Sequence, residues 1–211
     1  MKEFIYRVKP YKLMRILLPL LRGLMRLFFK MTVVGRENLP KNSGGIILAC
    51  NHLHATDPAF LAAFSHMEWR FMAKVELFRK SPVSFLLRHG NAFPVDRDII
   101  DRKALDFSLD IMRDGRCGLG IFPEGTRSPD GKPMQGKTGV AMIARKTKAD
   151  ILPCALIHDG LKFRGKVTVR FGEIIPFDAL GLGETPNKRQ NREATDQIMA
   201  AITALWEQGD A

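Results

Sequence analysis

The sequence predicts an α/β fold: a single domain in which a mixed, largely parallel sheet is flanked by helices, with an amphipathic helix at its N-terminal side. Two observations predict it. Short apolar runs with strand character alternate along the chain with segments whose apolar residues recur at helical spacing. A length of 211 residues, with 45% hydrophobic and 26% charged residues, suits one globular domain with a real core and excludes disordered and fibrous proteins.

Seven runs are predicted to be strands because each is short, apolar and bounded by turn residues. They span 31–34, 45–50, 70–73, 92–95, 117–122, 151–156 and 166–171. Helical spacing occurs around Phe60, Leu61 and Phe64, around Leu105, Leu109 and Met112, around Val140, Ile143 and Ala144, and over 192–207 after a link at 181–191. Open α/β sheets place their chemistry just beyond strand ends, which directs attention to the loops after the second, fourth and fifth runs.

The N-terminal segment, residues 1–30, is predicted to be a basic helix that lies on a membrane surface, with residues 31–211 forming the globular domain. Its cations are spaced three, four or seven residues apart and share one stripe, beside faces rich in leucine. They are Lys12, Arg15, Arg22, Arg26 and Lys30. The alternative is a helix packed on the core with a solvated basic edge. Pro19 argues against one straight helix.

Charge and cysteine content indicate where the protein works. The formal net charge of +11 requires negative partners, which are nucleic acid, anionic lipid or phosphorylated substrates. Two Trp and two Tyr offer no stacking platform, so we expect no nucleic-acid partner. Three cysteines without a close-spaced pair, no signal peptide and no uncharged span of about 18 apolar residues predict a peripheral protein on the cytoplasmic face of the cell membrane.

The first candidate site is the loop that follows the 45–50 run, with His52 and Asp57. A carboxylate that accepts a hydrogen bond from one imidazole nitrogen fixes the tautomer and leaves the other nitrogen free to take a proton. The pair therefore predicts a general base. Two alternatives stay open: Asp57 caps a helix that Pro58 begins, or His52, His54 and Asp57 bind a metal ion as in metal-dependent hydrolases.

Two arginines follow the other two strand ends. Arg97 closes the segment from Gly90, and Arg127 lies in a Gly-containing loop after Phe122. Two guanidinium groups can bind one phosphate bidentately, so the pair suits a phosphorylated substrate. Glu124 is a poor phosphate ligand by charge and suits a structural role, and Gly125 would permit close backbone approach.

In order and spacing, these segments resemble the glycerolipid acyltransferase family, in particular the bacterial lysophosphatidic acid acyltransferases. The family marks are a His-x4-Asp box, matched by His52 and Asp57, a Gly-x-x-Phe-x-x-x-Arg-like box ending at Arg97, and the Phe-Pro-Glu-Gly-Thr-Arg-Ser box at 122–128. Residues 151–154 resemble a fourth block of the family, an apolar strand that ends in a Pro-containing turn. One departure is His54, where many members have Ser.

The resemblance implies an O-acyltransferase that transfers an acyl group to the free sn-2 hydroxyl of lysophosphatidic acid, giving phosphatidic acid. Acyl-CoA or acyl carrier protein would be the donor, and no metal or redox cofactor is implied. His52 would be the base, Asp57 its partner, and Arg97, Glu124, Gly125 and Arg127 the phosphate site. Alternatives are another lysolipid or glycerol-3-phosphate as acceptor, a metal-dependent hydrolase, and a thiolate of Cys50 that takes the acyl group first.

One further pattern, Gly131 to Thr138, matches the Walker A motif letter for letter. A P-loop starts directly at the end of a strand, whereas a hydrophilic stretch separates this segment from the 117–122 run, so we do not interpret it as a nucleotide site. Lys137, Thr138 and Gly139 are instead predicted to open the helix that runs to Thr147. A lysine at a helix N-terminus can contribute to holding a phosphate, which adds Lys137 to the predicted phosphate site.

Overall fold

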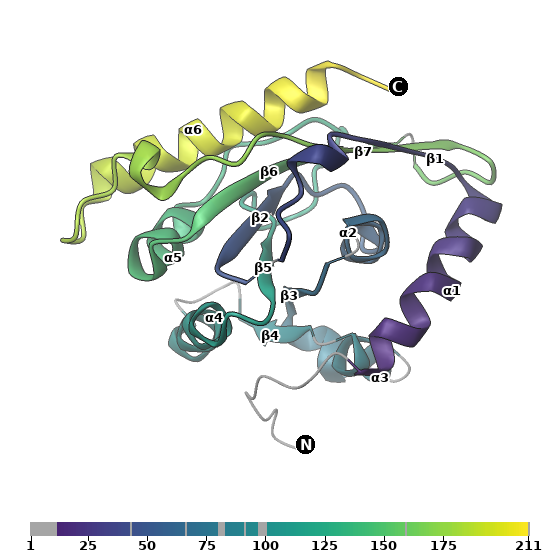
Figure 1. Ribbon diagram of the computed structural model, residues 1–211, viewed down its shortest axis with the longest axis horizontal. Helices are drawn as coiled ribbons and strands as arrows, with labels where there is room; N and C mark the ends of the chain where they lie inside the picture. The colour runs from purple at the N-terminus through teal and green to yellow at the C-terminus, as the bar shows by residue number, and fades with distance from the viewer. Residues whose placement is uncertain are drawn as a thin grey trace.

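A computed structural model describes residues 12–42, 44–65, 67–79, 83–90, 92–96, 101–158 and 160–210, with the side chains of 12–16, 83 and 86 excepted. Seven strands form one sheet in the order β1-β7-β6-β2-β5-β3-β4 (Figure 1). All neighbouring pairs are parallel except β6 and β7, which are antiparallel. The predicted α/β class and mixed, largely parallel sheet are confirmed.

All seven predicted strands are present, within one or two residues at their ends. They are β1 (Lys30–Val34), β2 (Ile46–Cys50), β3 (Trp69–Lys74), β4 (Phe93–Val95), β5 (Gly118–Ile121), β6 (Asp150–His158) and β7 (Lys166–Phe171). Side chains alternate across the sheet, as strand geometry requires. In β2, Ile47 and Ala49 enter one core cluster, whereas Ile46, Leu48 and Cys50 enter the other.

Helices cover both faces of the sheet. One face packs against α4 (Arg102–Asp114), α5 (Gly139–Thr147) and α6 (Lys188–Glu207). The other packs against α2 (Asp57–Ser65), and α1 (Lys12–Phe28) lies outside α2 at the edge of the molecule (Figure 1). Short helices complete the described chain: α3 (Val83–His89), η1 (Arg36–Asn38), η2 (Val75–Arg79) and η3 (Phe177–Leu180).

Three helices differ from the sequence prediction. The last helix begins at Lys188, four residues before the predicted start, because the side chain of Asn187 caps it by accepting from the amides of Arg189 and Gln190. Helix α3 was not predicted. Helix α1 continues through Pro19, whose ring costs one backbone hydrogen bond of the helix.

Helix α1 is held against α2 by polar and apolar contacts. Leu18 and Met25 are buried in the core cluster that α2 shares with the sheet. Nε of Arg22 donates to the carbonyl oxygen of Ala63 over 2.7 Å, and the guanidinium of Arg26 lies 5.7 Å from the ring centre of Phe64. Two cations of the predicted stripe thus face α2. No helix in the described ranges is long and apolar enough to span a bilayer.

Candidate active site

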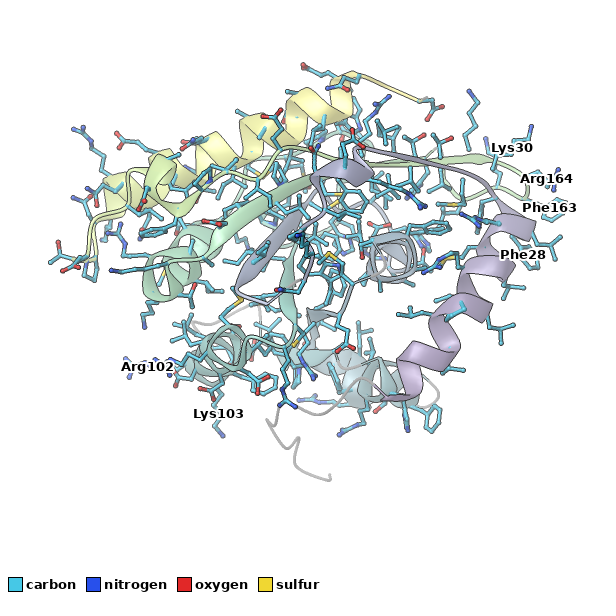
Figure 2. All side chains as sticks on the ribbon, viewed as in Figure 1. Phe28, Lys30, Arg102, Lys103, Phe163 and Arg164 are labelled. Atoms are coloured by element: carbon cyan, nitrogen blue, oxygen red, sulfur yellow. The ribbon has the colours of Figure 1, made fainter. Side chains whose placement is uncertain are left out.

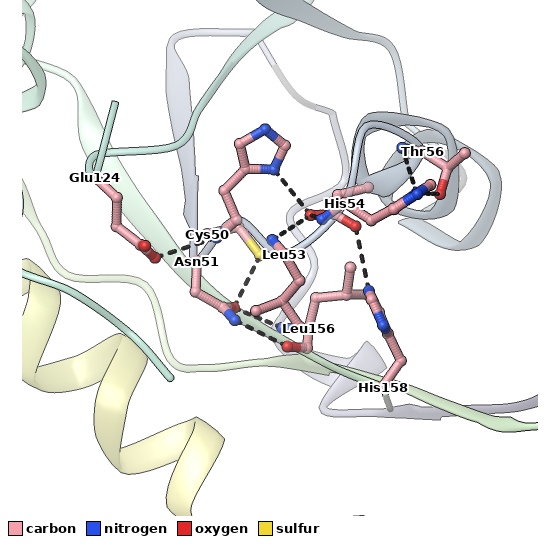
Figure 3. A network of polar contacts seen from close by, with 10 residues as sticks. Cys50, Asn51, Leu53, His54, Thr56, Glu124, Leu156 and His158 are labelled. Carbon is pink, nitrogen blue, oxygen red and sulfur yellow. Dashed lines mark hydrogen bonds and ion pairs between the residues drawn. The ribbon is translucent and has the colours of Figure 1, made fainter. Parts of the chain in front are cut away.

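The candidate site lies at the carboxyl ends of three adjacent strands in the middle of the sheet. Strand β2 ends at Cys50 and leads to His52, β5 ends at Ile121 and leads to Glu124, and β6 ends at His158. Since β6, β2 and β5 are neighbours and run parallel, these three ends meet at one edge. This is where open α/β sheets bind ligands. Figure 3 shows Glu124 and His158 reaching the polar network from opposite sides.

The predicted contact between His52 and Asp57 is present. Nδ1 of His52 lies 2.8 Å from Oδ2 of Asp57, and both side chains are buried. The His52 ring stacks on Phe122 with ring centres 4.1 Å apart. One edge and one face of the imidazole are therefore fixed by neighbours.

Asp57 is a carboxylate that holds its loop together. Oδ2 also accepts from the amides of Leu53 and His54, over 2.7 and 2.8 Å. Burial opposes ionisation, but hydrogen bonds from His158, His52 and the two amides outweigh it and lower the pKa of Asp57 below its ordinary value. Because an ionised carboxylate only accepts, Nδ1 of His52 donates, and its Nε2 is left to accept a proton.

The capping prediction for Asp57 was partly wrong. Asp57 does stand in the first turn of α2, followed by Pro58, but its carboxylate bonds the preceding loop and not the amides of the helix. The backbone carbonyl of Thr56 accepts the first helical hydrogen bonds instead, from Ala59 and Phe60. The side chain is thus available to orient His52.

The loop after β5 is hydrogen-bonded to the backbone of His52. Oε1 of Glu124 accepts from the His52 amide over 3.1 Å, and the Ser128 amide donates to the His52 carbonyl over 2.7 Å. Glu124 thus ties this loop to the backbone of His52, in line with the structural role expected from its charge. Burial raises the pKa of the Glu124 carboxyl to about 7, against the opposing effect of nearby backbone amides.

Gly125 and Lys137 meet at this loop. Gly125 has a φ of 71°, and a Cβ added to it would lie 2.9 Å from Cδ and 3.2 Å from Nζ of Lys137. The amide of Lys137 also donates to the carbonyl of Pro123 over 2.7 Å. Only glycine allows the lysine side chain to lie this close to the backbone. Arg127, two residues on, is exposed.

Comparisons with known proteins identify the family. A family model described as acyltransferase matches residues 30–157. The 1-acyl-sn-glycerol-3-phosphate acyltransferase of Bacillus subtilis is 30% identical over 82% of this chain and 86% of its own length. That of Borreliella burgdorferi is 32% identical over 83% of this chain and 73% of its own length. The chain belongs to the acyltransferase family.

A solved structure supports the same relationship. The crystal structure of the 1-acyl-sn-glycerophosphate (LPA) acyltransferase PlsC from Thermotoga maritima matches with a TM-score of 0.70 and 26% sequence identity. The match covers 96% of this chain and 83% of that one. The family match includes every described strand from β1 to β5 and nearly all of β6, so it covers the loops that carry His52, Asp57 and Glu124.

The predicted phosphate residues of this acyltransferase-family chain are only partly described. Glu124, Gly125 and Lys137 lie together, and Arg127 is in the same loop. Arg97 lies outside the described residues; the chain is described up to Asp96 and again from Asp101, where the amide of Asp96 donates to the Asp101 carboxylate. Both residues line the cavity described below.

A cavity of about 420 Å³ opens beside this loop, between the sheet and helices α4 and α5. Lys137, Thr138, Asp96 and Asp101 supply the polar side chains of its lining, and Gly125 of the loop lies beside Lys137. The remaining lining is apolar: Met72, Val95, Ala104, Leu105, Ile121, Phe122, Pro123, Val140, Met142 and Ile143, with Gly139. The arrangement suits a molecule with a charged head and an apolar tail.

Sequence reasoning missed two residues of the network. Asn51 is buried and exchanges two hydrogen bonds with the backbone of Leu156, which ties the start of the loop to β6. Nε2 of His158 lies 3.5 Å from Oδ1 of Asp57. Nothing near His158 in the sequence indicates this contact, because the two residues are 101 positions apart.

Two alternatives lose support from the geometry. Nδ1 of His54 contacts the hydroxyl of Thr56 at 2.9 Å, so its ring does not join His52 on Asp57. Within the described ranges, no three His, Cys, Asp or Glu side chains converge as a metal site. Cys50 is fully buried, and burial raises the pKa of its thiol well above the ordinary value, which disfavours a thiolate.

The Walker-like segment does not follow a strand, as predicted. Strand β5 ends at Ile121, and the carbonyl of Gly136 accepts from Arg192 on α6 over 2.7 Å. A Cβ on Gly136 would meet Met199 and Thr195 of the same helix. The segment is therefore packed against α6, and the helix that it precedes, α5, begins at Gly139 and ends at Thr147 as predicted.

Proposed function

We propose that this protein transfers a fatty acyl group from a thioester donor, acyl-CoA or acyl carrier protein, to the free sn-2 hydroxyl of lysophosphatidic acid, giving phosphatidic acid. The observation that carries the proposal is the buried contact between His52 and an ionised Asp57, which leaves Nε2 of His52 as a base. The names of the relatives supply the acceptor.

The reaction needs two proton transfers, one from the acceptor hydroxyl to His52 and one from His52 to the leaving thiolate. Nε2 of His52 takes the hydroxyl proton as the oxygen attacks the thioester carbonyl, and Asp57 stabilises the imidazolium that forms. Collapse of the tetrahedral intermediate breaks the carbon–sulfur bond, and the proton returns from His52 to the leaving thiolate. The thioester is already activated, so orientation and proton transfer carry the chemistry.

The acceptor phosphate is proposed to bind at the loop after β5. Lys137 and Arg127 supply positive charge, Gly125 lets the phosphate approach the backbone, and Arg97 joins them from the segment after β4. Glu124 shapes this loop through its bond to the amide of His52. With a pKa of about 7, its carboxyl can be neutral beside a phosphate, which limits charge repulsion.

The apolar cavity is proposed to hold an acyl chain. It begins at Phe122 and Gly125, beside the candidate base and the phosphate loop, and continues between α4 and α5. Burial of an acyl chain there would stabilise binding by roughly 0.8 kcal/mol for each methylene group. The chain would thus be placed with its reactive end near His52.

The protein is proposed to work as a peripheral protein at the cytoplasmic face of the cell membrane. Helix α1 presents Leu17, Leu20, Leu24 and Leu27 to solvent on one face. Arg26 and Lys30 are exposed beside it, with Lys12 and Arg15 in the same predicted stripe. Arg22 donates to Ala63 and so anchors α1 to the domain. This pattern suits an anionic lipid surface, where the acceptor resides.

Thiol release from acyl-CoA, measured with lysophosphatidic acid in detergent micelles, tests the proposal. His52→Ala should lower kcat by about 10²- to 10⁴-fold, as expected for loss of a general base. His54→Ala is the matched control, because His54 is exposed and contacts Thr56. Formation of phosphatidic acid by His52→Ala at the parent's rate would exclude the proposed mechanism.

Arg127→Ala separates phosphate recognition from chemistry. The variant should raise KM for lysophosphatidic acid about tenfold or more, and leave the rate with a monoacylglycerol, which has no phosphate, nearly unchanged. Glycerol-3-phosphate and other lysolipids complete the acceptor panel. Equal losses with phosphorylated and unphosphorylated acceptors would remove Arg127 from the phosphate site.

A further inference from the structure

The loop between β6 and β7 is fixed to the C-terminal end of α1. The amide of Arg164 donates to the Phe28 carbonyl over 2.6 Å, and the amide of Lys30 donates to the Gly165 carbonyl over 2.9 Å. The rings of Phe28 and Phe163 meet edge to face with centres 5.9 Å apart. Two segments more than 130 positions apart thus form one surface (Figure 2).

This anchoring leaves a large apolar ring in solvent. Phe163 is 72% exposed, although the backbone amides of its neighbours Arg164 and Lys30 are hydrogen-bonded. Leu161 and Arg164 have φ values of 57° and 60°, a left-handed backbone that costs non-glycine residues roughly 1–2 kcal/mol each. The loop thus adopts an unfavourable backbone while presenting Phe163 outward, which indicates that the exposed ring has a use.

The exposed apolar side chains continue along α1 without a break. Leu17, Leu20, Leu24, Leu27 and Phe28 are spaced so that they share one face of the helix, and Phe28 contacts Phe163. Six of the eight large apolar side chains that are exposed in the described ranges belong to this set. A contiguous apolar surface of this kind marks an interaction site.

The charged residues described around this surface are cations, while Asp159, at the start of the β6–β7 loop, lies outside the described residues. Lys30, Lys162, Arg164 and Lys166 are exposed around Phe28 and Phe163, and neither 12–34 nor 160–171 contains an acidic residue. A symmetric dimer through this surface would place these cations against the same cations of a second copy, which disfavours that partner. Apolar side chains within a ring of cations fit the interface of an anionic bilayer.

We propose that the described part of the β6–β7 loop, residues 160–165, is a second membrane-binding element, which enters an anionic lipid surface through Phe163 beside the exposed face of α1. The inference rests on the proposed function only in that the acceptor is a lipid. Helix α1 alone would leave the domain free to tilt about the helix axis. A second contact at the end of α1 fixes the orientation of the domain on the membrane.

Cosedimentation with vesicles of equal parts phosphatidylcholine and phosphatidylglycerol measures this contact without turnover. Phe163→Ser should weaken binding by about tenfold, because one exposed aromatic side chain no longer enters the lipid. Arg164→Glu should weaken binding at least as much, with most of the effect removed by high salt or by vesicles of phosphatidylcholine alone. Lys103→Glu makes the same charge change on α4, away from this end of the molecule, and should bind like the parent (Figure 2).

Tryptophan fluorescence tests directly whether the loop enters the lipid. Tryptophan introduced by Phe163→Trp should be quenched by phospholipids brominated in the acyl chain, beyond the signal of the parent's Trp69 and Trp206. Parent-like binding of Phe163→Ser and Arg164→Glu, or no added quenching, would overturn the proposal. So would a parent dimer that Phe163→Ser converts to a monomer, because the surface would then be a protein interface.

Activity in detergent micelles distinguishes failure of the proposed acyl transfer from failure of the proposed membrane contact. The Phe163→Ser and Arg164→Glu variants should retain the parent's rate there, since neither residue lines the cavity or takes part in the contact of His52 with Asp57. An inactive parent would contradict the proposed function and leave the vesicle result intact. Active variants that bind vesicles like the parent would contradict only the second membrane contact.

Discussion

Nε2 of His158 lies 3.5 Å from Oδ1 of Asp57, on the opposite carboxylate oxygen from the one that His52 contacts. The Asp57 carboxylate is therefore held between two imidazoles and two backbone amides (Figure 3). His158 is thus a positioning residue for Asp57.

Replacing His158 should change the pH dependence of stability. Burial opposes ionisation of Asp57, and the hydrogen bond from His158 is the largest contribution that lowers its pKa, so His158→Phe should raise that pKa. A carboxylate with a lowered folded-state pKa stabilises the fold above its ordinary pKa, and the stabilisation is lost as pH falls through the folded-state value. Urea unfolding of His158→Phe should therefore show a smaller loss of stability than the parent as pH falls below the ordinary value of 3.8, because the folded and unfolded pKa values of Asp57 lie closer together.

The same variant should lower kcat by about fivefold, since a long hydrogen bond to a charged group contributes roughly 1 kcal/mol. His158→Gln keeps an N–H donor and should recover most of both effects. If the Gln and Phe variants behave alike, His158 fills space and does not position Asp57.

Glu124 should make stability fall as pH rises toward neutrality. Burial raises its pKa from 4.5 to about 7, so the folded state holds this proton more tightly than the unfolded chain. Ionising the buried carboxyl therefore costs stability, increasingly as pH rises from 4.5 through about 7. Glu124→Gln removes that cost and keeps an oxygen for the His52 amide. The difference in unfolding free energy between Glu124→Gln and the parent should therefore increase, in favour of the variant, by up to about 3 kcal/mol from about pH 5 to about pH 8.

Urea denaturation at several pH values checks this expectation. Glu207→Gln, at the exposed C-terminal end of α6, is the control and should track the parent. A difference between Glu124→Gln and the parent that stays constant with pH would show that the carboxyl does not titrate in this range.

Ala104 should limit the length of the acyl chain. It is buried on α4 and lines the apolar cavity. Ala104→Leu adds three carbon atoms to the lining, so the ratio of rates with short and long acyl-CoA should shift toward the short donor by about tenfold. Loss of folded protein lowers both rates equally, so the ratio isolates the cavity. An unchanged ratio would place the acyl chain elsewhere.

The fold could be predicted because its signals are local. Each strand is a short apolar run, and in β2 the alternation of Ile46, Ile47 and Leu48 between two core clusters follows from strand geometry alone. The start of α6 was misplaced because the cap at Asn187 lies in a polar stretch that also suits a linker. Strand order, which brings β6 beside β2, is set by contacts far apart in sequence.

The same distinction explains what was found of the site. His52 and Asp57 are five positions apart, so their contact was visible in the sequence. The Glu124 bond to the His52 amide joins residues 72 positions apart, and a structural role was predicted without its partner. The contact of Arg22 with Ala63, 41 positions away, could not be seen in the helical spacing that grouped Arg22 with the lipid-facing cations.

Gly120 should control the site through a stack of three rings. The Phe71 ring stacks on Phe122 with centres 5.8 Å apart, and Phe122 stacks on His52. A Cβ on Gly120 would lie 2.1 Å from the Phe71 ring, so Gly120→Ala must displace Phe71, and we expect this shift to reach His52 through Phe122. We expect a loss of about 1–3 kcal/mol in unfolding free energy and a fall in kcat, measured under conditions where the variant is folded.

Phe71→Leu in the Gly120→Ala background tests the route of this effect. The smaller side chain makes room for the new methyl group, so the double variant should be more active and more stable than Gly120→Ala alone. Because the two residues touch, their effects should be non-additive by about 0.5–3 kcal/mol in a double-mutant cycle. Additive effects would mean that Gly120 acts on the strand itself, and that the ring stack does not transmit the change to His52.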